Sequence, residues 1–311
     1  MSWKAKGECC WSVPPGVGSL QYFFLFSFVN AVLNAHMSDS RFLALLLCLT
    51  PTAVAQFRCL LADVRNSMDG TYQFPGCDEL LLNGERIGDN GAIELAKALR
   101  SDKRLRLVDL WSNGIGPAGA KALAEALFVN DKLEKLYLNE NAIGSEGAAA
   151  IIAALGCPRS QPNACSKSSL QHLWLSRNQL GDAGAKALAD GLSDGKARRL
   201  QALDLWENGI SPAGGVALAK ALKTNFALLT LELRGNALGD AGARAFAELM
   251  PNNRALSTLD LSSNGISPAG TATLMEGLKV STANPYLVLF VEHVPHMQAT
   301  SWAQKGMPNA P

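Results

Sequence analysis

A single motif recurs along most of this chain and constrains its fold more than any other feature of the sequence. The motif reads LxxLxLxxNx(I/L), and its leucines and its asparagine return in register six times. The six copies begin at Leu105, Leu133, Leu170, Leu200, Leu228 and Leu256. A regular repeat of this kind predicts a stack of similar units in which each unit contacts only its neighbours.

The spacing of the copies is 28 residues except at two places. The interval before Leu170 is 37 residues, and the interval before Leu200 is 30 residues. The extra residues fall at about 156–169 and 193–199, where we expect loops.

Degenerate copies extend the frame in both directions. One lies at residues 77–85 and another at residues 287–294, and each carries a glutamate, Glu85 or Glu292, in the asparagine column. Terminal repeats of a stack are commonly atypical because they have only one neighbour. We therefore expect about eight strand units between residues 76 and 294.

Each copy predicts a short strand followed by a helix. The LxL core alternates apolar and polar residues, which is the two-residue period of a strand. Proline follows in three copies, at Pro117, Pro212 and Pro268, where it suits the first turn of a helix. Apolar residues then recur at helical spacing, as in residues 120–127, and predict one buried stripe. We expect the recurring Gly and Ala to let each helix approach the strand closely.

The asparagine column has a structural role in this interpretation. A side-chain amide can bond to backbone groups of the turn that leaves the strand, and stacked copies would form a ladder. The column consists of Asn113, Asn141, Asn178, Asn208, Asn236 and Asn264.

The repeat resembles the ribonuclease-inhibitor class of leucine-rich repeats, which is also found in NOD-like receptors and in Ran GTPase-activating proteins. The resemblance covers residues 76–294 and rests on the unit LxxLxLxxNxIGxxGAxxLAxAL. It implies an α/β solenoid of horseshoe form, with a parallel sheet on the concave face and helices on the convex face. It also implies a non-catalytic module that binds another protein.

Two other functions remain open beside protein binding. One is a GTPase-activating or NOD-like-receptor type of regulatory protein, although the sequence has no P-loop and its last residues, 295–311, have no acidic side chain. The other is a structural spacer.

Strand alternation identifies the residues of the concave face. The position between the two core leucines, and the two positions before the asparagine, should point away from the helices. Aromatic residues beside charges are typical of the centre of a protein interface. Six acidic side chains against two arginines favour a partner with a basic surface. The predicted contact residues are Asp109, Trp111, Tyr137, Glu140, Trp174, Arg177, Asp204, Trp206, Glu207, Glu232, Arg234 and Asp260.

Composition and motifs exclude several other classes of function. The 28 basic and 27 acidic residues are not segregated into runs, so a nucleic-acid-binding patch is not expected. The common motifs for phosphate binding, nucleophilic catalysis and metal binding are missing from the sequence. We therefore expect no enzyme activity, no cofactor, no metal and no small-molecule substrate. His172 should lie on the strand face as a contact residue.

The segment before the repeats has the layout of a targeting sequence. Residues 37–55 read as a signal peptide, with an apolar stretch followed by Ala53-Val54-Ala55. Residues 1–55 are therefore interpreted as a targeting or extension segment, residues 56–75 as an N-terminal cap, and residues 295–311 as a flexible tail. Contact with a membrane is expected only if the apolar N-terminal segment is retained.

Cysteine positions agree with a secretory route. Cleavage after residue 55 would leave Cys59, Cys77, Cys157 and Cys165, an even number that allows three disulfide pairings. Cys59 with Cys77, and Cys157 with Cys165, are the pairs closest in sequence. The resemblance implies the opposite, a cytoplasmic protein with free thiols, so secretory and cytoplasmic locations both stay open.

Overall fold

The computed structural model describes residues 58–59, 76–156, 166–193, 197–279, 281 and 287–291. Within these residues nine strands and seven helices are present, and from β2 onwards they alternate. The strands are β1 (Arg58–Cys59), β2 (Glu79–Leu81), β3 (Leu107–Asp109), β4 (Lys135–Tyr137), β5 (His172–Trp174), β6 (Ala202–Asp204), β7 (Thr230–Glu232), β8 (Thr258–Asp260) and β9 (Val288–Phe290). The helices are α4 (Gly88–Leu99), α5 (Pro117–Val129), α6 (Gly144–Ala154), α7 (Gly181–Leu192), α8 (Pro212–Leu222), α9 (Gly239–Leu249) and α10 (Pro268–Lys279).

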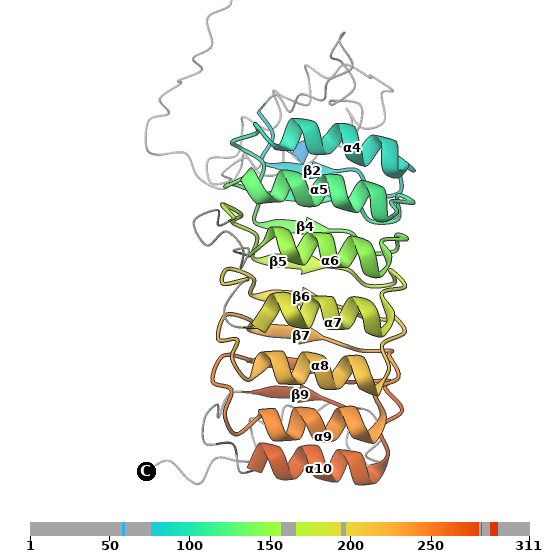
Figure 1. Cartoon of the computed structure of the whole chain (residues 1–311), viewed down its shortest axis with the longest axis vertical. Coiled ribbons are helices and arrows are strands. Elements are labelled where there is room, and N and C mark those ends of the chain that lie inside the picture. The colour runs from blue at the N-terminus through green and yellow to red at the C-terminus, as the bar shows by residue number, and fades with distance from the viewer. Residues whose placement is uncertain are drawn as a thin grey trace, which may run out of the picture. The chain divides into compact units, whose positions relative to one another are not determined.

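The strands form one parallel sheet in chain order, β1 to β9. Figure 1 shows the helices stacked in one layer, from α4 to α10, on one face of that sheet. The α/β solenoid predicted from the repeat is therefore confirmed. Strands β2 to β9 correspond to the eight predicted units, and β1 adds a ninth from within the segment 56–75 that the sequence assigned to a cap.

The core lies between the sheet and the helices. Its first column is the central residue of each three-residue strand, and parallel register aligns these residues from one repeat to the next. All of them are buried: Leu80, Val108, Leu136, Leu173, Leu203, Leu231, Leu259 and Leu289. The helices supply the opposite side, as in α5, where Ala120, Leu123, Ala124 and Leu127 are buried at the spacing that the sequence predicted.

The asparagine column lies inside the stack and connects successive repeats. All six asparagines are buried. Asn141 is representative, because its Oδ1 accepts hydrogen bonds from the N–H groups of Asn113 and Ile115, at 3.0 and 2.9 Å. Its Nδ2 donates to the carbonyls of Leu110 and Leu138, each at 2.9 Å. One side chain therefore satisfies buried backbone groups of two neighbouring repeats.

The recurring glycine in the first turn of each helix lies against an Ile or Leu of its own repeat and, in most repeats, also against the preceding helix. A Cβ atom added at Gly214 in α8 would lie 2.6 Å from Oδ1 of Asp182 and 2.9 Å from Cβ of Ala185. Both of these residues belong to α7. A larger side chain at this position would separate the two helices.

Aspartates in the first turn of three helices, α4, α7 and α9, bind the N-terminus of the next helix. Oδ1 of Asp182 accepts hydrogen bonds from the N–H groups of Ser211 and Gly214, at 2.8 and 3.0 Å. Asp89 and Asp240 act in the same way on the N-termini of α5 and α10. Each helix that receives such a bond, α5, α8 or α10, begins with proline. The carboxylate supplies acceptors for N–H groups that have no partner inside their own helix.

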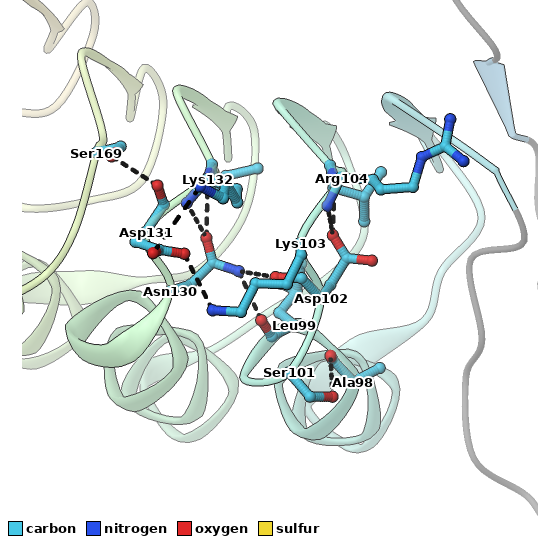
Figure 2. A network of polar contacts seen from close by, with 12 residues as sticks. Ala98, Leu99, Ser101, Asp102, Lys103, Arg104, Asn130, Asp131, Lys132 and Ser169 are labelled. Carbon is cyan, nitrogen blue, oxygen red and sulfur yellow. Dashed lines mark hydrogen bonds and ion pairs between the residues drawn. The ribbon is translucent and has the colours of Figure 1, made fainter.

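A second set of polar side chains orders the loops that lead from a helix into the next strand (Figure 2). Nδ2 of Asn130 donates to the carbonyl of Leu99 at 2.6 Å, and its Oδ1 accepts from the N–H of Leu133 at 2.8 Å. Asn225 and Asn253 make the corresponding bonds in later repeats. The sequence analysis did not identify this set, although its members stand three residues before the first leucine of a repeat.

Several predictions concern residues outside the described part of the chain. They include the signal peptide at 37–55, the tail at 295–311 and the side chains of Cys59, Cys157 and Cys165. Cys77 is fully buried and disulfide-bonded, but the pairings proposed from the sequence stay predictions. Among the described helices, none has the length and apolar character needed to span a bilayer.

Candidate interaction face on the parallel sheet

The face of the sheet opposite the helices, here called the sheet face, carries all twelve predicted contact residues. Each lies either at the end of a strand or in the turn that leaves it. Side chains alternate between the two faces along a strand. The first residue of each strand therefore lies on the same face as the last residue, and only the central residue points toward the core. The sequence analysis did not identify this column of first residues, except for His172. It includes Lys135, and strand alternation alone could have identified it. The structure also adds Phe290, which is exposed in β9.

Three aromatic residues of consecutive repeats, at or just after the ends of β3, β4 and β5, form what we call the aromatic patch: Trp111, Tyr137 and Trp174. The rings of Tyr137 and Trp174 stack, with centroids 4.0 Å apart and an interplanar angle of 14°. Trp174 remains 37% exposed and Trp111 remains 44% exposed. Large aromatic surfaces that stay in water are available for contact with another molecule.

Trp206 is held differently from the aromatic patch. The Arg177 guanidinium lies 4.6 Å from the centre of its ring, and that of Arg234 lies 5.8 Å away. Arg177 in turn bonds to Glu140 through Nη1 and to Glu207 through Nε, each at 2.7 Å. These five residues form the charged belt. Three of the predicted contact charges are therefore ion-paired with one another across three repeats, and one negative charge remains in excess.

The charged belt is built partly on residues in the left-handed backbone region. Glu140, Arg177 and Glu207 have φ values of 55°, 55° and 50°. This conformation is uncommon for residues other than glycine and costs about 1 kcal/mol each. Gly235 occupies the same column in the turn after β7, and a Cβ atom there would lie 2.8 Å from Cγ of Glu207 and 3.0 Å from Nε1 of Trp206. Gly235 therefore leaves room for the indole.

Three carboxylates stand side by side on β6, β7 and β8 and form the acidic row: Asp204, Glu232 and Asp260. Each is the register partner of the next. Adjacent strands are about 4.8 Å apart, so the three like charges are close. Among the described residues, no ion pair neutralises them. Oδ1 of Asp204 and of Asp260 each accepts a backbone hydrogen bond, from Trp206 and Ser262.

The acidic row changes the proton affinity of its members. Burial raises the pKa of Glu232 to about 7, and the carboxylates of Asp260 and Asp204 act in the same direction. Burial also raises the pKa of Asp204, although the hydrogen bond from Trp206 opposes the change. The central carboxyl of the row is therefore about half protonated near neutral pH in the unbound protein.

Burial affects two further groups near the aromatic patch. It raises the pKa of Asp109, against a 3.0 Å hydrogen bond from the N–H of Trp111. It lowers the pKa of His172, and the neighbouring charge of Lys135 adds to the effect. The lower pKa favours the neutral form of the His172 imidazole. Nowhere in the described part of the chain do three or more His, Cys, Asp or Glu side chains converge as metal ligands would.

Comparison with known proteins identifies the repeat. The family described as Leucine Rich repeat matches residues 105–124, 129–151, 166–189, 197–219, 224–247 and 252–275. Comparison of the sequence with curated proteins gives no match.

Solved structures of similar form include the leiomodin-1 actin-binding site 2, with 21% identity, a TM-score of 0.33, and coverage of 51% of this chain and 72% of that one. The tropomodulin C-terminal domain of Caenorhabditis elegans has 13% identity, a TM-score of 0.34, and coverage of 55% and 81%. A Bacteroides fragilis protein has 13% identity, a TM-score of 0.40, and coverage of 76% and 69%. These likenesses are too distant to support an argument about function. The six matched repeats, together with the parallel sheet and its layer of helices, make this chain a leucine-rich-repeat protein.

Proposed function

We propose that this chain is a non-catalytic protein-interaction module whose sheet face binds a protein with a basic surface. The observation that supports the proposal is the presence of two unsatisfied features on one face. The aromatic patch exposes Trp111 and Trp174 to water, and the acidic row holds three carboxylates without a described cation.

Both features would contribute to binding through ordinary physical effects. Burial of exposed tryptophan is the usual source of strong single-residue contributions at protein interfaces. Like charges placed side by side repel one another, and a cation on the partner would relieve that repulsion. Arg177 does not supply it, because it is already bonded to Glu140 and Glu207.

The test is a double substitution in the aromatic patch, Trp111→Ala with Trp174→Ala. Proteins retained from an extract of the source cells by the native chain, and chemically cross-linked to the sheet face, should be lost by this variant. Because both indoles are exposed, the variant should unfold at nearly the native temperature.

The matched control is Phe226→Ala. Phe226 is 64% exposed, but it lies in the loop between α8 and β7 and not on the sheet face. It should retain every partner. Equal retention by all three chains would contradict the proposal and favour a structural spacer. Faster GTP hydrolysis by an added small GTPase would favour a regulatory activator instead.

A further inference from the structure

The register of the sheet places two members of the aromatic patch, Tyr137 and Trp174, on one line with the acidic row. Tyr137, Trp174, Asp204, Glu232 and Asp260 occupy the same position in consecutive strands, β4 to β8, and each is the register partner of the next. The line therefore crosses the strands. It begins with a stacked aromatic pair and continues as three carboxylates.

The spacing along this line fits an extended peptide. With strands about 4.8 Å apart, the middle of the Tyr137–Trp174 pair lies about 7 Å from the Asp204 position and about 17 Å from the Asp260 position. An extended chain advances about 3.3 Å per residue. A side chain on the aromatic pair and side chains on the acidic row would thus be separated by about two to five residues.

The residues beside the acidic row leave one side approachable. The first residues of β6, β7 and β8 are Ala202, Thr230 and Thr258, whose side chains are short. On the other side lie Arg177 and Arg234, whose guanidinium groups are near Trp206. Arg177 is matched by Glu140 and Glu207, so Arg234 is the charge on this side that would repel a cation leaving the row.

We propose that the segment bound by the sheet face is extended and lies across the strands, with an apolar or aromatic side chain on the Tyr137–Trp174 pair and Lys or Arg side chains two to five residues away on the acidic row. The proposal rests on the proposed function and specifies its partner by charge and spacing. The backbone of the segment can cross in either direction, because side chains supply the recognition.

The experiment uses three fluorescein-labelled peptides of equal length and charge, measured with the full chain by fluorescence anisotropy. The first places lysines two, four and five residues from a single tryptophan. The second places the same lysines eight to ten residues away. The third replaces the tryptophan of the first by glycine. Each peptide is also made with its sequence reversed.

We expect the first peptide, in one direction or both, to bind about tenfold more tightly than the other two. Trp174→Ala should remove the advantage over the third peptide. Asp204→Asn with Asp260→Asn should lower the affinity for the first peptide about tenfold. The difference in affinity between the first and third peptides, which measures the contribution of the tryptophan, should stay unchanged. Glu125→Gln, an exposed carboxylate on α5, is the charge control and should have no effect.

Three outcomes overturn the inference. Equal affinity for the first and second peptides would show that the sheet face does not discriminate the separation between the tryptophan and the lysines. Equal losses in Glu125→Gln and in the acidic-row variant would indicate general charge attraction. If no peptide binds while a protein partner is still lost on Trp111→Ala with Trp174→Ala, the sheet face recognises a folded surface; the proposed function then stands and this inference fails.

Discussion

At the scale of single residues, one side chain can hold two repeats together because its amide bonds to the backbone of its own repeat and of the preceding one. Nδ2 of Asn178 donates to the carbonyls of Leu138 and Leu175, at 2.8 and 3.1 Å, and its Oδ1 accepts from the N–H of Ile143 at 3.2 Å. All of these groups are shielded from water, so none can find a replacement partner without local opening.

Asn178→Leu should therefore lower the free energy of unfolding by about 2–3 kcal/mol, because a side chain of similar size leaves buried backbone groups unpaired. Denaturant unfolding followed by circular dichroism measures the change. Glu85→Ala is the matched control. Glu85 occupies the same column in the first repeat but is exposed, and its removal should change stability by less than about 0.5 kcal/mol. Similar losses at both positions would contradict a ladder confined to the interior.

Glu232 makes the stability of the protein depend on pH in an unusual direction. Its pKa in the folded chain is about 7 against an ordinary value of 4.5, so the folded state binds more protons than the unfolded state between these values. The free energy of unfolding should therefore fall as pH rises from about 4.5 to about 7. Above this interval Glu232 is ionised in both states, and the full destabilisation from its buried charge is present.

Glu232→Gln should remove that destabilisation. We expect it to raise the free energy of unfolding at pH 8 by about 1–2 kcal/mol, a figure reduced for solvent screening because the carboxyl is only half-buried. At pH 5 native and variant chains should differ little. Thermal unfolding at both pH values provides the measurement. A variant that is less stable than the native chain at pH 8 would show that the acidic row does not strain the fold.

At the scale of elements, helices are joined in pairs as well as in one continuous stack. The aspartate bridges run from α4 to α5, from α7 to α8 and from α9 to α10. Burial alone would raise the pKa of Asp182, but its hydrogen bonds from Ser211 and Gly214 outweigh this effect and lower it. The contribution of the bridge to stability is thus present above the ordinary pKa near 4 and is lost as pH falls through the lower folded value.

Asp182→Ala should lower the free energy of unfolding by about 1 kcal/mol at pH 7, the usual cost of losing a side-chain cap. The difference from the native chain should shrink as pH falls below about 4. Hydrogen exchange should accelerate most at the amides of Ser211 and Gly214, which donate to this carboxylate. Glu146→Ala, an exposed acid in the first turn of α6, is the control and should have a smaller effect. Equal protection of these amides in the native chain and in Asp182→Ala would rule out the bridge.

At the scale of the whole molecule, charge is nearly balanced but unevenly distributed. The chain has a formal net charge of +1. The sheet face, in contrast, keeps an excess of acid after Arg177 has been matched with Glu140 and Glu207. A basic partner is therefore attracted to one face of a nearly neutral protein, and salt should screen that attraction.

The association rate of the first peptide, with lysines two, four and five residues from its tryptophan, should fall about tenfold between about 0.05 M and about 0.5 M salt. Its dissociation rate should change less. Asp204→Asn with Asp260→Asn should reduce this dependence on salt. Trp174→Ala should mainly increase the dissociation rate, since aromatic burial acts after the encounter. Stopped-flow fluorescence separates the two rates. A salt-independent association rate would contradict electrostatic attraction to the acidic row.

The order of strands and helices, the buried leucine columns and the side of the sheet that faces water were all predictable from the sequence. The reason is that a fixed frame of 28 residues carries two periods, two residues for the strand and 3.6 for the helix, and repeats them in register. Where one copy departs from the motif, the other copies still show which position in the repeat each of its residues occupies. The column of a residue such as Trp111 or Asp260 therefore follows from its place in the motif.

Contacts between neighbouring repeats were decided only by the tertiary structure. The sequence assigns Trp174 and Trp206 to the same face, but it does not show that Trp174 stacks on Tyr137 and stays exposed, while Trp206 lies near two arginines. It also counts Arg177 as a free charge, although two carboxylates bond to it. These outcomes depend on how side chains 28 to 37 residues apart in sequence meet across adjacent strands. The motif fixes the face and column of a residue, whereas the packing of the repeats determines which side chains remain free to bind.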